Sequence, residues 1–243
     1  MLDTVMWDGR TEPNSIRVGD PEKLLELFAD AKSGQWDRVL AFLSLSDHAE
    51  FLNALELDNP SLNTVLHYAA LTNADPVVVR QLVDMGTWRT RRNASNQTAL
   101  DLAKEHNHTS LYDILEPVLK MAVPPETLQQ LEYHFHDLIR SYKDSGSIVT
   151  GQALQLPQLA PMLEIGGTPM FFLIPGMFGG FDYRMENGSS ETVLYTHISS
   201  RMDEPSEGQI HKITLSGIEL LAEGKEIDFF LLLEIIHGRK RNG

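Results

Sequence analysis

The chain contains 243 residues, of which 42% are hydrophobic, and carries a formal net charge of −14 at pH 7. It contains no cysteine, which excludes disulfide bonds, thiolate metal ligands and a cysteine nucleophile, and fits a reducing cytoplasm. Acidic residues outnumber basic ones 18 to 11 in residues 1–120 and 16 to 9 in residues 121–243. This charge disfavours nucleic-acid binding and suits a basic protein partner, although it could serve only to keep the protein soluble.

The sequence predicts no membrane segment. Its first residues lack the basic and apolar regions of a secretory signal. The longest apolar run, residues 227–236, is interrupted by Asp228 and Glu234 and is too short to span a bilayer. We therefore expect a soluble, cytoplasmic protein with no membrane contact.

A sequence repeat with 34-residue spacing dominates the first half of the chain. The stretch Thr64–Ala70, Thr-Val-Leu-His-Tyr-Ala-Ala, returns as Thr98–Ala103, Thr-Ala-Leu-Asp-Leu-Ala. Each copy continues with a polar break and a second helix that carries an apolar pair. A fainter copy covers residues 27–43 and is followed by an insertion at residues 47–59. A period of this length predicts a stacked array of helical repeats, whose usual function is binding.

These residues resemble the ankyrin repeat, whose pattern is Gly-x-Thr-Pro-Leu-His-x-Ala-Ala, a Gly break, a Val-x-x-Leu-Leu helix and a closing Gly. The resemblance covers roughly residues 21–120. Val65 and Ala99 replace the usual Pro, and Leu62 and Asn96 replace the Gly that precedes the Thr. The resemblance implies a concave binding surface made of the projecting turns and the first helix of each repeat.

The domain organisation follows from the extent of this repeat. Each repeat buries its apolar face only against neighbours, so a short array needs caps at both ends. We assign residues 1–20 to an N-terminal cap, residues 21–122 to the ankyrin repeats and residues 123–243 to an α+β domain. The sequence Val123-Pro124-Pro125 marks the break between the last two.

The projecting turn between the two best repeats, residues 86–93, is basic and aromatic. It contains Trp88, Arg89, Arg91 and Arg92 on an otherwise acidic chain. Trp and Arg are the residues most enriched in interface hot spots, so we take these four as a candidate partner-binding site. The alternative is that Trp88 packs against a neighbouring repeat or the second domain while the arginines offset nearby acids.

The second half predicts one helix followed by an antiparallel meander, which gives the whole chain an α+β fold. The helix covers residues 126–142 and either caps the repeats or begins the new domain. Alternating or continuous apolar patterns then predict four or five strands within residues 147–221. The expected strands are Met170–Ile174, Phe181–Glu186, Thr192–Ser199, Gln209–Leu215 and Ile218–Leu221.

A glycine-rich loop covers residues 175–181. It lacks the Lys-Ser/Thr of a phosphate-binding P-loop and precedes a strand instead of a helix, so we favour a tight turn or bulge. Met177 and Phe178 at its tip are either an exposed contact or buried plugs. Together with residues 156–157 and 209–214, the loop resembles a small domain of bacterial chains that also carry ankyrin repeats. This resemblance implies a bacterial origin and no particular activity.

Three further polar residues, His197, Arg201 and His211, fall on or beside adjacent predicted strands. They could meet Tyr183, Arg184 or Glu186 and form an acid/base site, or they could simply belong to a polar sheet face. The glycine-rich loop and these residues make up a candidate second site. Its members are Gly176, Met177, Phe178, Gly179, Gly180, His197, Arg201 and His211.

The remaining histidines predict no metal site. His106 and His108 flank the turn between two repeat helices, and His67 occupies a position where the repeat customarily has a histidine. His134 and His136 are two residues apart on a predicted helix, so their rings point in nearly opposite directions. We expect no metal and no cofactor.

Two functions remain open from the sequence. The first is a non-enzymatic interaction protein whose ankyrin array binds another protein, for example an acidic inhibitor or immunity-type protein that covers a basic toxin or enzyme. The alternative is an enzyme with its site in the second domain, around His197, Arg201 and His211, and with the repeats recruiting the substrate.

Overall fold

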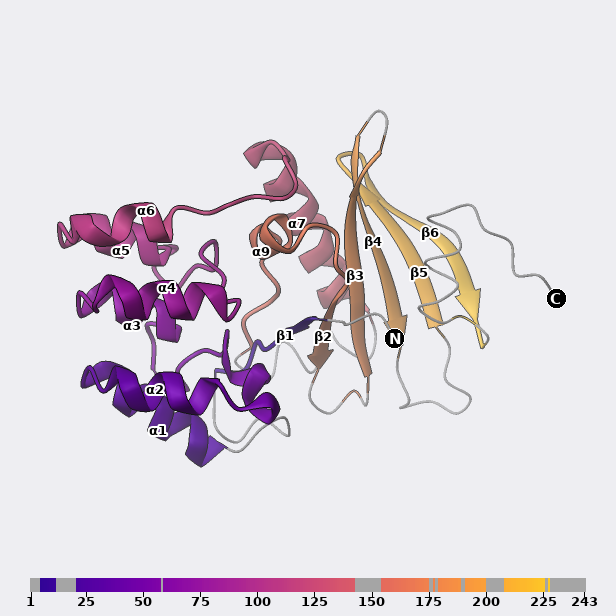
Figure 1. Cartoon of the computed structure of the whole chain (residues 1–243). Coiled ribbons are helices and arrows are strands. Elements are labelled where there is room, and N and C mark those ends of the chain that lie inside the picture. The colour runs from indigo at the N-terminus through magenta and orange to yellow at the C-terminus, as the bar shows by residue number, and fades with distance from the viewer. Residues whose placement is uncertain are drawn as a thin grey trace. The chain divides into compact units, whose positions relative to one another are not determined.

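The structure, a computed structural model of the chain, describes residues 5–11, 21–57, 59–142, 154–174, 177, 179–188, 191–199, 208–225 and 227. These residues form eight α-helices and a six-stranded, mostly antiparallel sheet, which confirms the α+β class (Figure 1). They divide into two compact units. The helical unit contains the described residues of 8–120 and 154–164, and the sheet unit contains those of 5–7, 121–142 and 165–227.

The helical unit is a stack of helix pairs (Figure 1). Helix α3 packs against both α1 and α5, and α4 packs against both α2 and α6, so first helices stack on first helices and second helices on second helices. The pairs are α1 (Pro21–Lys32) with α2 (Trp36–Leu43), α3 (Val65–Leu71) with α4 (Pro76–Asp84), and α5 (Ala99–Glu105) with α6 (Tyr112–Leu115). Two 3-10 turns, η1 (Ser46–Phe51) and η2 (Thr109–Leu111), lie in the connections.

The 34-residue spacing of the sequence is also a spacing of helix caps. Thr64 precedes α3, and its side chain accepts a hydrogen bond from the backbone of His67, whose ring in turn accepts one from the backbone of Thr64. Thr98 and Asp101 make the same reciprocal pair at the start of α5. Each capping box satisfies backbone N–H groups that the first turn of a helix leaves unpaired.

The same spacing relates four residues with a left-handed backbone. Leu62 and Asn96 have φ values of 52° and 61°, and they stand where the repeat pattern has Gly. Asn73 and Asn107, at 52° and 59°, end the first helices of their pairs. Positive φ strains residues that have a Cβ atom, least so asparagine. The backbone therefore repeats every 34 residues even where the side chains differ.

The core of the helical unit lies between the stacked helices. Ala69, Ala70, Val79 and Leu82 are fully buried there, with the small alanines where α3 approaches its neighbours. Short helices such as α3 are marginal alone, so this burial supplies most of their stability.

The sheet unit contains the strands in chain order, β1 to β6. Strand β1 is parallel to β2, and each later neighbour is antiparallel. Helix α7 (Pro125–Ser141) contacts β4, β5 and β6, and its Phe135 packs 4.9 Å from the ring of Tyr183. The strands are β1 (Val5–Trp7), β2 (Met170–Ile174), β3 (Gly179–Asn187), β4 (Thr192–Ser199), β5 (Gly208–Thr214) and β6 (Gly217–Gly224).

Two segments differ from the predicted organisation. The sequence pattern assigns residues 1–20 to a cap of the repeats, but Val5–Trp7 pairs with Met170–Phe172 as an edge strand of the sheet. Residues 154–164 follow the predicted break in the chain, yet they belong to the helical unit and include most of helix α9 (Ala160–Ile165). Neither segment has a long periodic pattern that would assign it to one unit.

Candidate functional site

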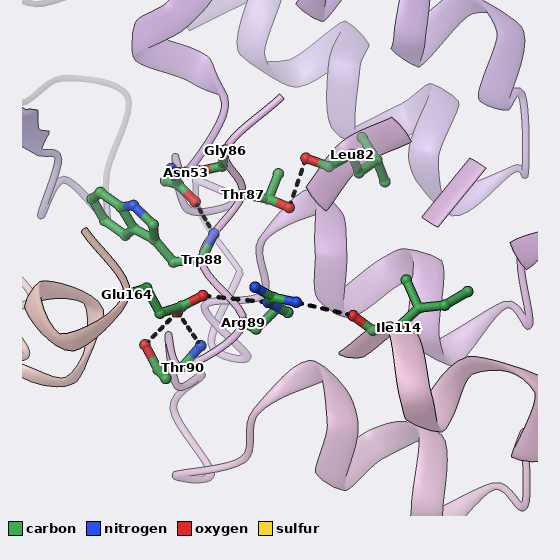
Figure 2. Close-up of polar contacts among 9 residues, drawn as sticks. All are labelled: Asn53, Leu82, Gly86, Thr87, Trp88, Arg89, Thr90, Ile114 and Glu164. Atoms are coloured by element: carbon green, nitrogen blue, oxygen red, sulfur yellow. Dashed lines mark hydrogen bonds and ion pairs between the residues drawn. The ribbon is translucent and has the colours of Figure 1, made fainter. Parts of the chain in front are cut away.

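The projecting turn of residues 86–93, hereafter the finger, is held at its base by the helical unit. Gly86 has a φ of 104°, which turns the chain after α4. The hydroxyl of Thr87 donates to the carbonyl of Leu82 at 2.9 Å, and the amide of Trp88 donates to Asn53 Oδ1 at 2.8 Å (Figure 2). The side chain of Asn53 also donates to the carbonyl of Gly86 at 3.2 Å. These contacts attach the first three residues of the finger to the helical unit.

Trp88 and Arg91 point into the protein. Trp88 is 5% exposed and Arg91 is 0% exposed. The guanidinium of Arg91 donates to the carbonyl of Asp8 at 2.8 Å, to Gln155 Oε1 at 3.1 Å and to the carbonyl of Asn53, and it lies 5.7 Å from the Trp88 ring. The burial of Trp88 agrees with the internal role that the sequence offered as an alternative. Arg91 is buried as well, but it donates to carbonyl and amide oxygens and not to the acids that this alternative expected.

Residues 154–164, hereafter the strap, bind the backbone of the finger. The Gln158 side chain accepts from the amide of Arg92 at 2.8 Å and donates to the carbonyl of Arg92 at 2.9 Å. The amide of one side chain thus accepts one hydrogen bond from the backbone of Arg92 and donates another to it. A residue of a neighbouring β-strand exchanges the same two hydrogen bonds with its partner. The Arg92 side chain itself is exposed and donates to the carbonyl of Asn96 at 2.9 Å.

A buried carboxylate makes the second contact of the strap. Glu164 is 8% exposed and accepts from the amide of Thr90 at 2.8 Å and from its hydroxyl at 2.7 Å (Figure 2). The guanidinium of Arg89 lies 3.4 Å from the same carboxylate and 3.4 Å from the carbonyl of Ile114. Hydrogen bonds to an ionised carboxylate are stronger than neutral ones, so Glu164 fixes two finger residues at once.

The sequence predicts no role for the strap. The only available signal is that Gln155, Gln158 and Glu164 interrupt an otherwise apolar, proline-containing stretch. Without a period or a motif, such a stretch does not reveal that its polar residues contact a turn more than 60 residues earlier in the chain.

The structure does not bring the histidines of the candidate second site together. His197 pairs with Ile210, and Thr196 pairs with His211. Because side chains alternate between the two faces of a strand, His197 and His211 lie on opposite faces of the sheet. Arg201 lies outside the described residues. The predicted acid/base cluster is therefore not assembled in the part of the chain that the structure describes.

His197 is paired with Asp182, which no sequence motif indicates. Its Nδ1 lies 3.0 Å from Asp182 Oδ2, and its Nε2 lies 3.3 Å from the carbonyl of Ile227. The two residues face each other because Asp182 and His197 are direct partners of β3 and β4. Both ring nitrogens are engaged and the ring is buried, so this pair is suited to holding the sheet together.

His211 lies in the core of the sheet unit. It shares one cross-strand row with Thr196 and Tyr183, and all three are buried. Burial lowers the pKa of His211, because removing the ring from water disfavours its charged form. The row is therefore part of the interior and offers no open surface for a substrate.

Of the glycine-rich loop, the structure describes Met177 and residues 179–181. The amide of Met177 donates to the carbonyl of Ile174 at 3.1 Å, and the Met177 side chain is fully buried, as a plug would be. A Cβ atom at Gly180 would lie 2.1 Å from the carbonyl oxygen of Phe172, so close strand packing requires glycine there. Gly179 pairs with Ile174 in the same hairpin, while Gly176 and Phe178 lie outside the described residues.

The repeat histidines satisfy backbone groups. His67 Nδ1 accepts from the amide of Thr64 at 3.1 Å, which leaves the ring proton on Nε2 to donate to the carbonyl of Gln97 at 3.0 Å. His108 Nδ1 lies 2.8 Å from the carbonyl of Ala70 in the preceding pair. Across the described residues, no three His, Asp or Glu side chains are grouped to hold a metal ion.

Comparison with known proteins adds no family. The chain matches no protein-family model, and no curated protein matches it. Within the described residues, no helix is both long enough and apolar enough to cross a membrane.

Proposed function

We propose that this chain is a protein–protein interaction protein that uses a short array of ankyrin-type repeats as its binding scaffold. The observation that carries the proposal is the stack of helix pairs whose caps and left-handed residues recur every 34 residues. Such arrays are extended and present rows of equivalent surface positions, which suits them to binding other macromolecules.

A basic protein is the partner that the charges favour. Some cations of the helical unit are buried or paired with acids: Arg91 is buried, Arg89 lies against Glu164, and the exposed Lys32 contacts the buried Glu56. Exposed acids remain on both rows of helices, namely Glu26, Asp37, Asp84 and Glu105. Complementary charge of this kind accelerates association and selects partners, as in an inhibitor or immunity-type protein.

The alternative of an enzyme centred on His197, Arg201 and His211 draws no support from the sheet. The two histidines lie on opposite faces, and both are buried. A general base must reach the proton that it abstracts, and neither ring is placed to meet a substrate together with the other.

A matched pair of charge-reversal variants tests the proposal. The first variant carries Glu26→Lys and Glu105→Lys on the first helices α1 and α5, and the second carries Asp37→Lys and Asp84→Lys on the second helices α2 and α4. Both change the net charge equally. The full chain and each variant are used to capture proteins from the native source, and captured proteins are quantified by mass spectrometry.

We expect the wild-type chain and the second-helix variant to capture the same basic protein in stoichiometric amount, and the first-helix variant to lose it. The proposal fails if no stoichiometric protein is captured, or if the first-helix variant captures the partner as well as the wild type does.

A further inference from the structure

We propose that the finger is a peptide-binding surface and that the strap, residues 154–164, is its resident ligand, bound within the same chain. This inference goes beyond the proposed function, since it needs no external partner. It rests on the way in which the strap recognises the finger.

The contacts have the chemistry of peptide recognition. The finger presents backbone groups, namely the amide of Thr90 and both the amide and the carbonyl of Arg92. The strap meets all three through side chains, with Glu164 on Thr90 and Gln158 on Arg92. Gln155 adds a contact to the guanidinium of Arg91 at 3.1 Å. Backbone recognition of this kind provides affinity, and the side chains that make it provide specificity.

The chemistry of the two strap anchors matches the groups that they meet. Gln158 accepts from the amide of Arg92 through its side-chain oxygen and donates to the carbonyl of Arg92 through its side-chain nitrogen. Glu164 faces an amide, a hydroxyl and the Arg89 guanidinium, all of them donors, so a carboxylate suits this position.

The separation of the two strap anchors in the sequence defines the class of peptide that the finger would bind. The surface selects a segment with a glutamine and, six residues later, a glutamate. Between them, Leu159 and Met162 are fully buried, so the segment also needs apolar residues at these positions.

A covalently attached ligand competes with any free one. The strap is present at the effective concentration set by its connection to the chain, so a free peptide of the same sequence meets an occupied surface. Removing the two anchors weakens the resident ligand while the finger residues stay unchanged. The free peptide should then bind.

The experiment uses a fluorescently labelled synthetic peptide with the sequence of residues 154–164 and two full-length chains, the wild type and the Gln158→Ala, Glu164→Ala variant. We expect the peptide to bind the variant at least about tenfold more tightly than it binds the wild type, because it restores the missing hydrogen bonds. A control peptide with the same two substitutions should lose this preference. Equal binding of the unsubstituted peptide to both folded chains overturns the proposal.

Amide hydrogen exchange on the wild-type chain decides the question if the variant does not fold. A displaceable strap opens locally, so the amides of Thr90 and Arg92 should exchange faster than the buried amides of α5. If the amides of Thr90 and Arg92 exchange only with global unfolding, the strap is a permanent part of the fold and the proposal is wrong.

Discussion

Glu164 accepts hydrogen bonds from both the backbone amide and the hydroxyl of Thr90, at 2.8 and 2.7 Å, although 74 residues separate them in the chain. This pair attaches a segment encoded after the repeats to a turn within them. Both residues belong to the helical unit.

Truncation of this carboxylate should destabilise the protein. Glu164→Ala leaves the Thr90 donors and the Arg89 guanidinium without their acceptor, and we expect a loss of about 3 kcal/mol in the free energy of unfolding. Urea denaturation measures this loss. Glu116→Ala removes an exposed carboxylate and should change stability by less than about 0.5 kcal/mol. Equal stability of the two variants would show that the strap contact contributes little.

The finger variants distinguish an internal role from a partner-binding role. Trp88→Ala combined with Arg91→Glu removes a buried ring and places an acid among carbonyl acceptors, so we expect a loss of more than about 4 kcal/mol. Arg92→Glu changes an exposed side chain and should leave the thermal midpoint nearly unchanged. Thermal unfolding of both variants provides the comparison. A double variant as stable as the wild type would mean that Trp88 and Arg91 are not packed as described.

The backbone at Leu62 predicts a stabilising substitution. A φ of 52° is unfavourable for leucine and favourable for glycine, so Leu62→Gly should raise the free energy of unfolding by about 1 kcal/mol. The matched control is Leu25→Gly, at an exposed position inside helix α1, which should lower stability by about 1 kcal/mol. Chemical denaturation of the two variants should therefore give opposite signs, and two losses would contradict the left-handed backbone at residue 62.

His67 should make stability depend on pH. Burial is the main cause that lowers its pKa from 6.5 to about 4, with the charge of Arg91 adding to the effect. Between these values the unfolded chain binds a proton that the folded ring does not, so stability is full above pH 6.5 and falls as the pH drops toward 4. The full loss is about 3 kcal/mol.

Urea unfolding at pH 7 and at pH 4.5 measures this dependence. A His67→Gln variant starts less stable at pH 7 but should lose less stability on acidification, because glutamine does not titrate. If the wild type and the variant fall in parallel between the two pH values, other groups account for the acid sensitivity.

Much of the fold can be predicted from sequence periodicity. The caps at Thr64 and Thr98 and the helices that follow them come from a repeated local pattern, and local patterns fix local structure. The strand Met170–Ile174 is observed with its predicted bounds, because a continuous apolar run indicates a buried strand.

The remaining features depend on contacts between distant residues. Strand β1 has only three residues, too few for a pattern, and it pairs with a strand more than 160 residues later. Placing His197 and His211 on the same or opposite faces requires the register of β4 and β5, which the sequence of either strand alone does not specify. The strap is the clearest case, since Gln158 and Glu164 bind backbone groups of Arg92 and Thr90, which carry no side-chain signature.

The most direct test of the proposed binding function is the affinity of the captured basic partner for the first-helix variant that carries Glu26→Lys and Glu105→Lys. We predict that titration calorimetry gives at least about tenfold weaker binding than the wild type, while the second-helix variant with Asp37→Lys and Asp84→Lys keeps most of its affinity. Wild-type binding should also weaken as salt rises, since exposed charge pairs are screened. Undiminished affinity of the first-helix variant, or wild-type binding that is insensitive to salt, would contradict a charged binding surface on the first helices of the array.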